Sequence, residues 1–135
     1  MEALLIEGTT TNPEVNFRPD EYILEIGGYS RPENVHNFYT PLIAWLKDYK
    51  TRLKQELKTT QNIEPVTFNF KYIYFNSSSA KFMSDIILLL SDMQKSNIQL
   101  KVYWYFDEDD DELKEAGEEL SEMANIPFHF VEITR

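Results

Sequence analysis

The sequence predicts a single α/β domain, residues 1–135, with a mixed, mostly parallel sheet of about five strands and three main helices. Segments of strand and helix periodicity alternate in the order β-β-α-β-α-β-α-β, and helical crossovers of this kind favour parallel pairing. The chain has 135 residues, which is enough for one domain and too few for two. Apolar residues make up 42% of it and aromatic residues 14%, as in a packed globular protein.

The N-terminal part is predicted to hold two short strands separated by a loop. Residues 3–6 are apolar, and residues 22–26 read Tyr-Ile-Leu-Glu-Ile before a pair of glycines. Residues 8–20 are rich in Thr, Asn and Pro, and neither Pro13 nor Pro19 has an N–H group for a sheet ladder. We therefore expect a hairpin of two strands with a long loop.

The first helix is predicted from apolar side chains that recur at helical spacing. Ser30 or Asn34 is expected to cap this helix, because both side chains accept hydrogen bonds from free backbone N–H groups. Pro41 is expected either to bend the helix or to mark a late start. The apolar positions are Val35, Phe38, Tyr39, Leu42, Ile43, Leu46, Tyr49 and Leu53.

Two further strand–helix units and a last strand complete the predicted fold. Residues 66–75 alternate as a strand whose end is apolar on both faces, as expected for a central strand covered on both sides. Helical spacing runs from about residue 79 to 95 and from about 110 to 124. Residues 98–106 and 127–133 are predicted strands. The inward face of the 66–75 strand is expected to carry Val66, Phe68, Phe70, Tyr72 and Tyr74.

Composition and charge exclude several classes of function. The formal net charge of −10 disfavours nucleic acid and anionic membrane surfaces as direct partners. The absence of cysteine excludes disulfides, thiol catalysis and Cys-ligated zinc. No apolar run is long enough to cross a membrane and no signal peptide is evident, so we expect a cytoplasmic protein. The glycines form neither a phosphate-binding loop nor a dinucleotide fingerprint, and no cofactor is expected.

The chemistry of the sequence is concentrated where the 66–75 strand meets the next helix. There the chain reads Phe-Asn-Ser-Ser-Ser-Ala-Lys, which places Ser77, Ser78 and Ser79 beside the free N–H groups of a helix N-terminus. The same position stabilises a phosphate, because the helix dipole favours negative charge there. One hydroxyl can cap the helix while a neighbour stays exposed for phosphorylation. The alternative is one capping hydroxyl and two that are merely solvated.

A run of carboxylates at residues 107–112 supports a rival hypothesis. Asp107, Asp109 and Asp111 would serve a metal-dependent phosphoesterase if they converged on a cation. The spacing lacks the glycine and the distal glutamate of a calcium loop, so an exposed loop whose acids cap the next helix is the favoured interpretation. No catalytic residue and no metal ligand are predicted.

Short motifs along nearly the whole chain resemble those of a known family. In order, they are Gly28-x-Ser30-x-Pro32-Glu33, Pro41 with Trp45, Tyr74-Phe75-Asn76-Ser77-Ser78-Ser79-x-Lys81, Trp104 with Asp110, and Gly117-Glu118. Together they resemble the SiaC family of bacterial regulatory phosphoproteins. That family is similar in architecture to anti-sigma-factor antagonists with the STAS fold, so the resemblance implies a STAS-like domain.

The resemblance also implies a function, which is partner switching without enzymatic activity. By position, Ser77 is the residue that a serine/threonine kinase phosphorylates and a metal-dependent phosphatase dephosphorylates. The dephosphorylated form is expected to bind and activate a diguanylate cyclase. Asn76, Ser78, Ser79 and Lys81 are expected to surround the phosphate and contact partners.

Three points stay open on the sequence alone. Ser78 remains an alternative phosphoacceptor to Ser77. Arg31 stands where relatives often carry Tyr, which leaves the identity of the partner open. A constitutive scaffold without a switch predicts instead that Ser77 is buried or fully engaged as a cap.

Overall fold

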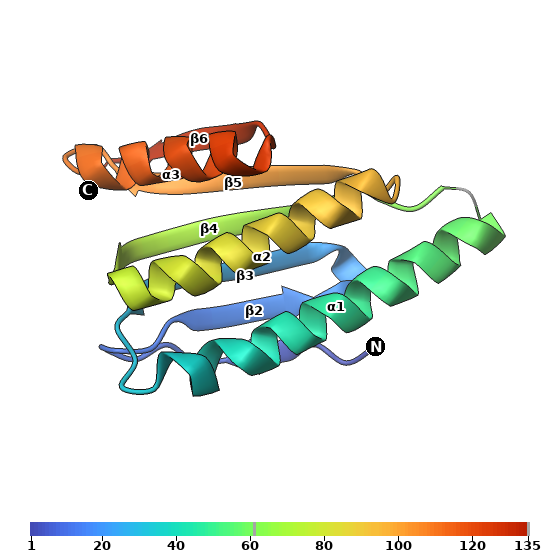
Figure 1. Ribbon diagram of the computed structural model, residues 1–135, viewed down its shortest axis with the longest axis horizontal. Helices are drawn as coiled ribbons and strands as arrows, with labels where there is room; N and C mark the ends of the chain where they lie inside the picture. The colour runs from blue at the N-terminus through green and yellow to red at the C-terminus, as the bar shows by residue number, and fades with distance from the viewer. Residues whose placement is uncertain (61, 135) are drawn as a thin grey trace.

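A sequential sheet with helices on one side forms the fold in the computed structural model, which describes residues 1–60 and 62–134 (Figure 1). Within those residues the sheet order is β1-β2-β3-β4-β5-β6. The strands are β1 (Leu4–Ile6), β2 (Glu14–Arg18), β3 (Ile23–Ser30), β4 (Val66–Phe75), β5 (Leu100–Asp107) and β6 (Phe128–Ile133). The helices are α1 (Val35–Thr60), α2 (Ser77–Lys95) and α3 (Asp111–Ala124), with a short 3-10 turn, η1 (Pro19–Glu21).

The sheet is mixed, and its later strands are parallel. β1, β2 and β3 pair antiparallel, and β3, β4, β5 and β6 pair parallel. Because each parallel strand lies next to its predecessor, right-handed crossovers bring α1, α2 and α3 to the same face of the sheet (Figure 1). The predicted α/β class with a mostly parallel sheet is confirmed. The expectation that β4 is covered on both faces is wrong, since Ile73 on its other face is 38% exposed.

The strand count differs from the prediction at β2, which lies inside the predicted loop of residues 8–20. Val15 and Phe17 alternate with polar residues and are fully buried, so this short segment has one core-facing side. Pro13 precedes the strand and Pro19 opens η1, so neither proline interrupts the ladder. β2 therefore separates β1 from β3, and the predicted direct hairpin between them becomes a three-stranded antiparallel meander.

The core lies between the sheet and the helices. Its largest fully buried side chains include Trp104, Tyr39, Tyr49, Phe17, Phe68 and Phe70. Asn34 caps α1, because its Oδ1 accepts a hydrogen bond from the N–H of Asn37 at 3.0 Å, whereas Ser30 lies in β3. α1 begins before Pro41 and continues past it, so the predicted late start is wrong. None of the described helices is long and apolar enough to span a membrane.

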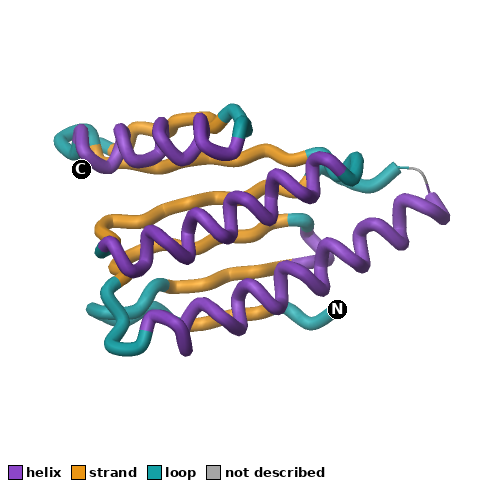
Figure 2. The backbone as a smooth tube through the Cα atoms, in the orientation of Figure 1, coloured by secondary structure: helices purple, strands orange, loops and turns teal. Residues whose placement is uncertain are grey.

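The carboxyl ends of β3, β4 and β5 meet at one edge of the sheet, where α1, α2 and α3 begin (Figure 2). Parallel strands always bring these ends together, because each crossover returns the chain to the opposite edge. The serine cluster and the carboxylate run both lie at this edge.

Candidate functional site: the start of helix α2

Helix α2 is held in place at its first residues by β3. Asn76 is the N-cap, and its Oδ1 accepts a hydrogen bond from the N–H of Ser79 at 2.9 Å. The Asn76 N–H donates to the carbonyl oxygen of Ser30, the last residue of β3, at 3.0 Å. Asn76 thus fixes where α2 begins and leaves Ser77 as the first helical residue.

The three serines lie in different environments. Ser77 and Ser78 are exposed, whereas Ser79 is fully buried with a relative exposure of 0%. The Ser79 side chain therefore does not reach a partner protein, and the expectation that it contacts one is corrected. Lys81 is exposed and lies four residues after Ser77, which puts both on one side of the helix.

Ser79 belongs to a chain of buried hydroxyl groups that joins four elements. The Tyr39 and Tyr72 hydroxyls lie 3.1 Å apart, and the Tyr39 hydroxyl lies 2.5 Å from Ser30 Oγ. Ser30 Oγ donates to Ser79 Oγ at 2.7 Å, and Ser79 Oγ donates to the Ser30 carbonyl oxygen at 3.1 Å. Since each hydroxyl has one proton, the order of donation is Tyr72, Tyr39, Ser30, Ser79. The chain ties β4, α1, β3 and α2 together.

Burial keeps the phenols of Tyr39 and Tyr72 neutral in this chain of hydroxyl groups. Loss of solvation raises the pKa of Tyr39, although its hydrogen bonds act in the opposite direction. Burial likewise raises the pKa of Tyr72 well above its usual range, and the neighbouring Tyr39 adds to that shift. No buried side-chain oxygen or nitrogen of the described residues lacks a hydrogen-bond partner. The hydroxyl chain is therefore a structural anchor for the first turn of α2.

The arrangement is suited to hold a charged group on Ser77. The N–H groups of the first helical turn have no intrahelical partner, and the helix dipole favours negative charge there. A phosphate on Ser77 would lie beside those N–H groups, within one helical turn of the Lys81 ammonium. The site thus combines an accessible hydroxyl, free N–H donors and a nearby cation.

The carboxylate run caps α3, as the favoured interpretation predicted. Asp110 Oδ1 accepts a hydrogen bond from the N–H of Leu113 at 3.0 Å, and Asp107 Oδ1 accepts one from the N–H of Asp109 at 3.0 Å. Across residues 1–60 and 62–134, no group of three or more acidic, His or Cys side chains is placed to hold a metal ion. The convergence of Asp107, Asp109 and Asp111 that the phosphoesterase hypothesis requires is not found.

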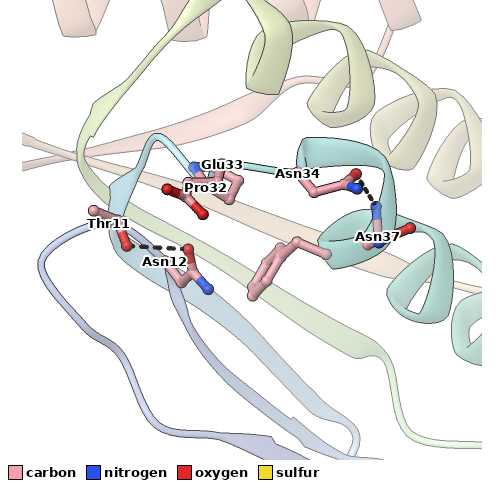
Figure 3. Close-up of a pocket in the computed structure, with 7 residues that line it drawn as sticks. Thr11, Asn12, Pro32, Glu33, Asn34 and Asn37 are labelled. Carbon is pink, nitrogen blue, oxygen red and sulfur yellow. Dashed lines mark hydrogen bonds between the residues drawn. The ribbon is translucent and has the colours of Figure 1, made fainter.

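A polar pocket beside this edge was not predicted from the sequence. It lies between the β1–β2 loop, with Thr11 and Asn12, and the start of α1, with Asn34 and Asn37 (Figure 3). Arg31 joins the two loops, because its backbone N–H donates to the carbonyl oxygen of Thr11 at 2.8 Å and its Nε donates to that of Thr10. Arg31 therefore has a structural role beside this pocket.

Comparison with known proteins shows relatives over nearly the full length. The sequence model of the SiaC family, described as regulatory phosphoproteins, matches residues 6–133. An uncharacterized protein of Pseudomonas aeruginosa strain UCBPP-PA14 is 26% identical over 128 residues, which are 95% of this chain and 94% of that protein.

Solved structures with the same fold come from P. aeruginosa as well. SiaC has a TM-score of 0.78 and 25% sequence identity, with 100% of both chains covered. Apo-SiaC has a TM-score of 0.80 and 25% identity over 98% of each chain. The crystal structure of the diguanylate cyclase SiaD in complex with its activator SiaC gives a TM-score of 0.79 and 24% identity, over 98% of this chain and 99% of that one. With its family match over nearly every residue, this chain belongs to the SiaC family of regulatory phosphoproteins.

Proposed function

We propose that this chain is a non-enzymatic, cytoplasmic signalling protein that binds and regulates a diguanylate cyclase under the control of reversible phosphorylation at Ser77. The observation that carries the proposal is the exposed hydroxyl of Ser77 at the first position of α2, two residues before the buried anchor Ser79. Membership of a family of regulatory phosphoproteins supports it. So does the solved complex in which SiaC is the activator of the cyclase SiaD.

The switch is electrostatic. In the unmodified protein the partner contacts Ser77 as a neutral hydroxyl. Phosphorylation adds a charge of about −1.5 to −2 to this side chain. Leaving a charge unpaired in an interface costs about 2–5 kcal/mol. At about 1.4 kcal/mol per tenfold change, one phosphate weakens binding by roughly 30-fold to several thousand-fold. A serine/threonine kinase would add the phosphate and a metal-dependent phosphatase would remove it.

Asn76, Ser78 and Lys81 complete the proposed contact surface. Ser78 and Lys81 are exposed, and Asn76 is half-buried at the cap. A constitutive scaffold would need Ser77 buried or fully engaged, and its exposure favours the switch instead.

The test is a comparison of Ser77→Asp with Ser77→Ala for binding to a purified diguanylate cyclase of the same organism. We expect Ser77→Ala to bind at least about 30-fold more tightly, because the carboxylate mimics part of the phosphate charge. Gln94→Glu, which adds a carboxylate at the exposed far end of α2, is the matched control and should bind like the unmodified protein. Intact-mass measurement of Ser77→Ala and Ser78→Ala from the native host identifies the phosphorylated residue directly. Equal affinities of Ser77→Asp and Ser77→Ala would refute the switch.

A further inference from the structure

Strands β4 and β5 separate before they end, and a groove opens between them. β3 pairs with β4 as far as Phe75, and β5 pairs with β6 as far as Asp107. The pairing of β4 with β5, however, ends at Phe70 and Trp104. On the side of β4 that faces β5, residues 71–75 therefore have no partner strand.

The space beside this separation is lined by both apolar and acidic side chains. Two adjoining pockets of about 330 and 210 Å³ share Ile73, Asp110 and Leu113, and together they form what we call the β4–α3 groove. Ile73 is 38% exposed and Tyr74 is 47% exposed, although Tyr74 was predicted to face inward. Side chains of this size at the end of a central strand remain exposed to water unless another molecule covers them.

The rim of the groove is acidic. Asp109 and Asp110 line it beside the end of β5, and Glu112 lines it in the first turn of α3. Lys71 is the one lysine among the described residues that line it, and it is engaged elsewhere, because its Nζ lies 2.8 Å from Glu25 and over the ring of Tyr105. The groove therefore combines an apolar floor with an excess of carboxylates over cations at its rim, and a second copy of this acidic chain is a poor occupant for it.

The wall formed by α3 packs closely against Trp104. Trp104 Nε1 donates a hydrogen bond to the carbonyl oxygen of Leu113 at 3.0 Å. Gly117 lies so close to the same indole that a Cβ atom there would come within 2.6 Å of it. The groove is consequently preformed, which limits the entropy lost when it is filled.

We propose that the β4–α3 groove binds an extended segment of the partner protein that carries both apolar and basic side chains. The unpaired edge of β4 suits an extended backbone, the floor suits apolar side chains, and the carboxylates suit Lys or Arg. Tyr74 and Phe75 directly precede the capped start of α2, so the groove is continuous with the surface around Ser77. The inference rests on the proposed function for the partner's identity. The groove supplies affinity in both phosphorylation states, whereas Ser77 supplies the switch.

The test measures affinity for the same purified cyclase in Ser77→Ala and Ser77→Asp backgrounds. Ile73→Ser and Glu112→Lys alter the groove, whereas Met123→Ser and Glu119→Lys are matched controls on α3 outside it. We expect each groove variant to weaken binding about tenfold or more in both backgrounds, and each control to stay within about twofold. Raising the salt from about 50 to 500 mM should weaken the parent more than Glu112→Lys.

A second measurement tests, without the cyclase, whether the groove binds a peptide of the proposed chemistry. A short peptide of alternating arginine and valine is titrated into the full chain, and backbone amide shifts are followed by NMR. We expect shifts confined to the end of β4 and the start of α3, and none with a peptide of alternating glutamate and valine. Groove variants that bind the cyclase like their controls, or peptide shifts spread over the whole acidic surface, would overturn the proposal. The contrast between Ser77→Ala and Ser77→Asp tests the switch in either case.

Discussion

Ser79 and Ser77 are two residues apart and have opposite roles. The buried Ser79 hydroxyl ends a chain of donors, whereas the exposed Ser77 hydroxyl makes no hydrogen bond with other described residues. Position on the helix explains the difference. Ser79 shares a stripe with the buried Met83 and Ile86, and Ser77 shares one with the exposed Lys81 and Asp85.

The direction of donation along the hydroxyl chain predicts which of two nearly isosteric substitutions costs more unfolding free energy. Tyr39→Phe removes a hydroxyl from the middle of the chain and leaves the buried Tyr72 donor without an acceptor, so it should cost about 1–3 kcal/mol of unfolding free energy. Tyr72→Phe removes only the first donor and should cost about 0.5–1.5 kcal/mol. Urea denaturation measures both values. A larger cost for Tyr72→Phe would show that the protons run the other way.

At the scale of the element, the proposed phosphorylation of Ser77 would stabilise helix α2. A phosphate on Ser77 would lie at the positive end of the helix dipole, which is worth about 0.3–1 kcal/mol, and an acid four residues before a lysine adds about 0.2–0.5 kcal/mol. We therefore expect phosphorylated protein to melt at a higher temperature than unmodified protein, and Lys81→Ala to remove part of that gain. Lys101→Ala, which alters an exposed lysine on β5, is the control. A phosphorylated form that is less stable than the unmodified one would contradict this placement of the phosphate.

Periodicity predicted the elements that have a clear buried face. α2 and β5 lie close to their expected bounds, because Met83, Ile86 and Leu90 recur at helical spacing and Val102 and Trp104 alternate. β2 escaped prediction because only two of its residues face the core, and prolines flank it. The presence of a candidate site at Ser77 was evident from local chemistry, and the helical stripe could also have shown that Ser79 is buried.

The β4–α3 groove could not be predicted from the sequence. It depends on where the pairing of β4 with β5 ends, at Phe70 and Trp104, and no local pattern in either strand marks that point. The only local sign was an apolar strand end on both faces, at Ile73 and Tyr74, which equally fits a strand buried on both sides.

At the scale of the whole molecule, the sheet has one face covered by helices and one face open. Paired polar and aromatic groups make the open face compatible with water. Glu25 there accepts hydrogen bonds from Asn69 at 2.9 Å and Lys71 at 2.8 Å, and the Lys71 ammonium lies over the ring of Tyr105. Sequential strand order thus separates a hydrophobic core from a polar sheet surface within one layer.

The covered face holds Tyr39, Tyr49 and Tyr72, and their burial makes the stability of the whole fold sensitive to alkaline pH. Burial raises the pKa of each of these phenols in the folded state. A raised folded pKa means that the stabilisation is complete below the unfolded value of about 10 and is lost as pH rises above it, because only the unfolded chain then releases the proton. Each tyrosine contributes a slope of up to about 1.4 kcal/mol per pH unit.

We therefore expect the free energy of unfolding in urea to be flat near pH 8 and to fall steeply between about pH 10 and 11. Tyr72→Phe should reduce that slope by up to about 1.4 kcal/mol per pH unit, since it removes one buried titrating group. Tyr29→Phe removes a hydroxyl from a tyrosine that is 38% exposed, and this matched control should reduce the slope less than Tyr72→Phe does. Because both variants keep every lysine of the chain, the difference between their slopes isolates the buried phenol. A slope for Tyr72→Phe identical to that of the unmodified protein would mean that Tyr72 ionises as readily in the folded protein as in the unfolded chain.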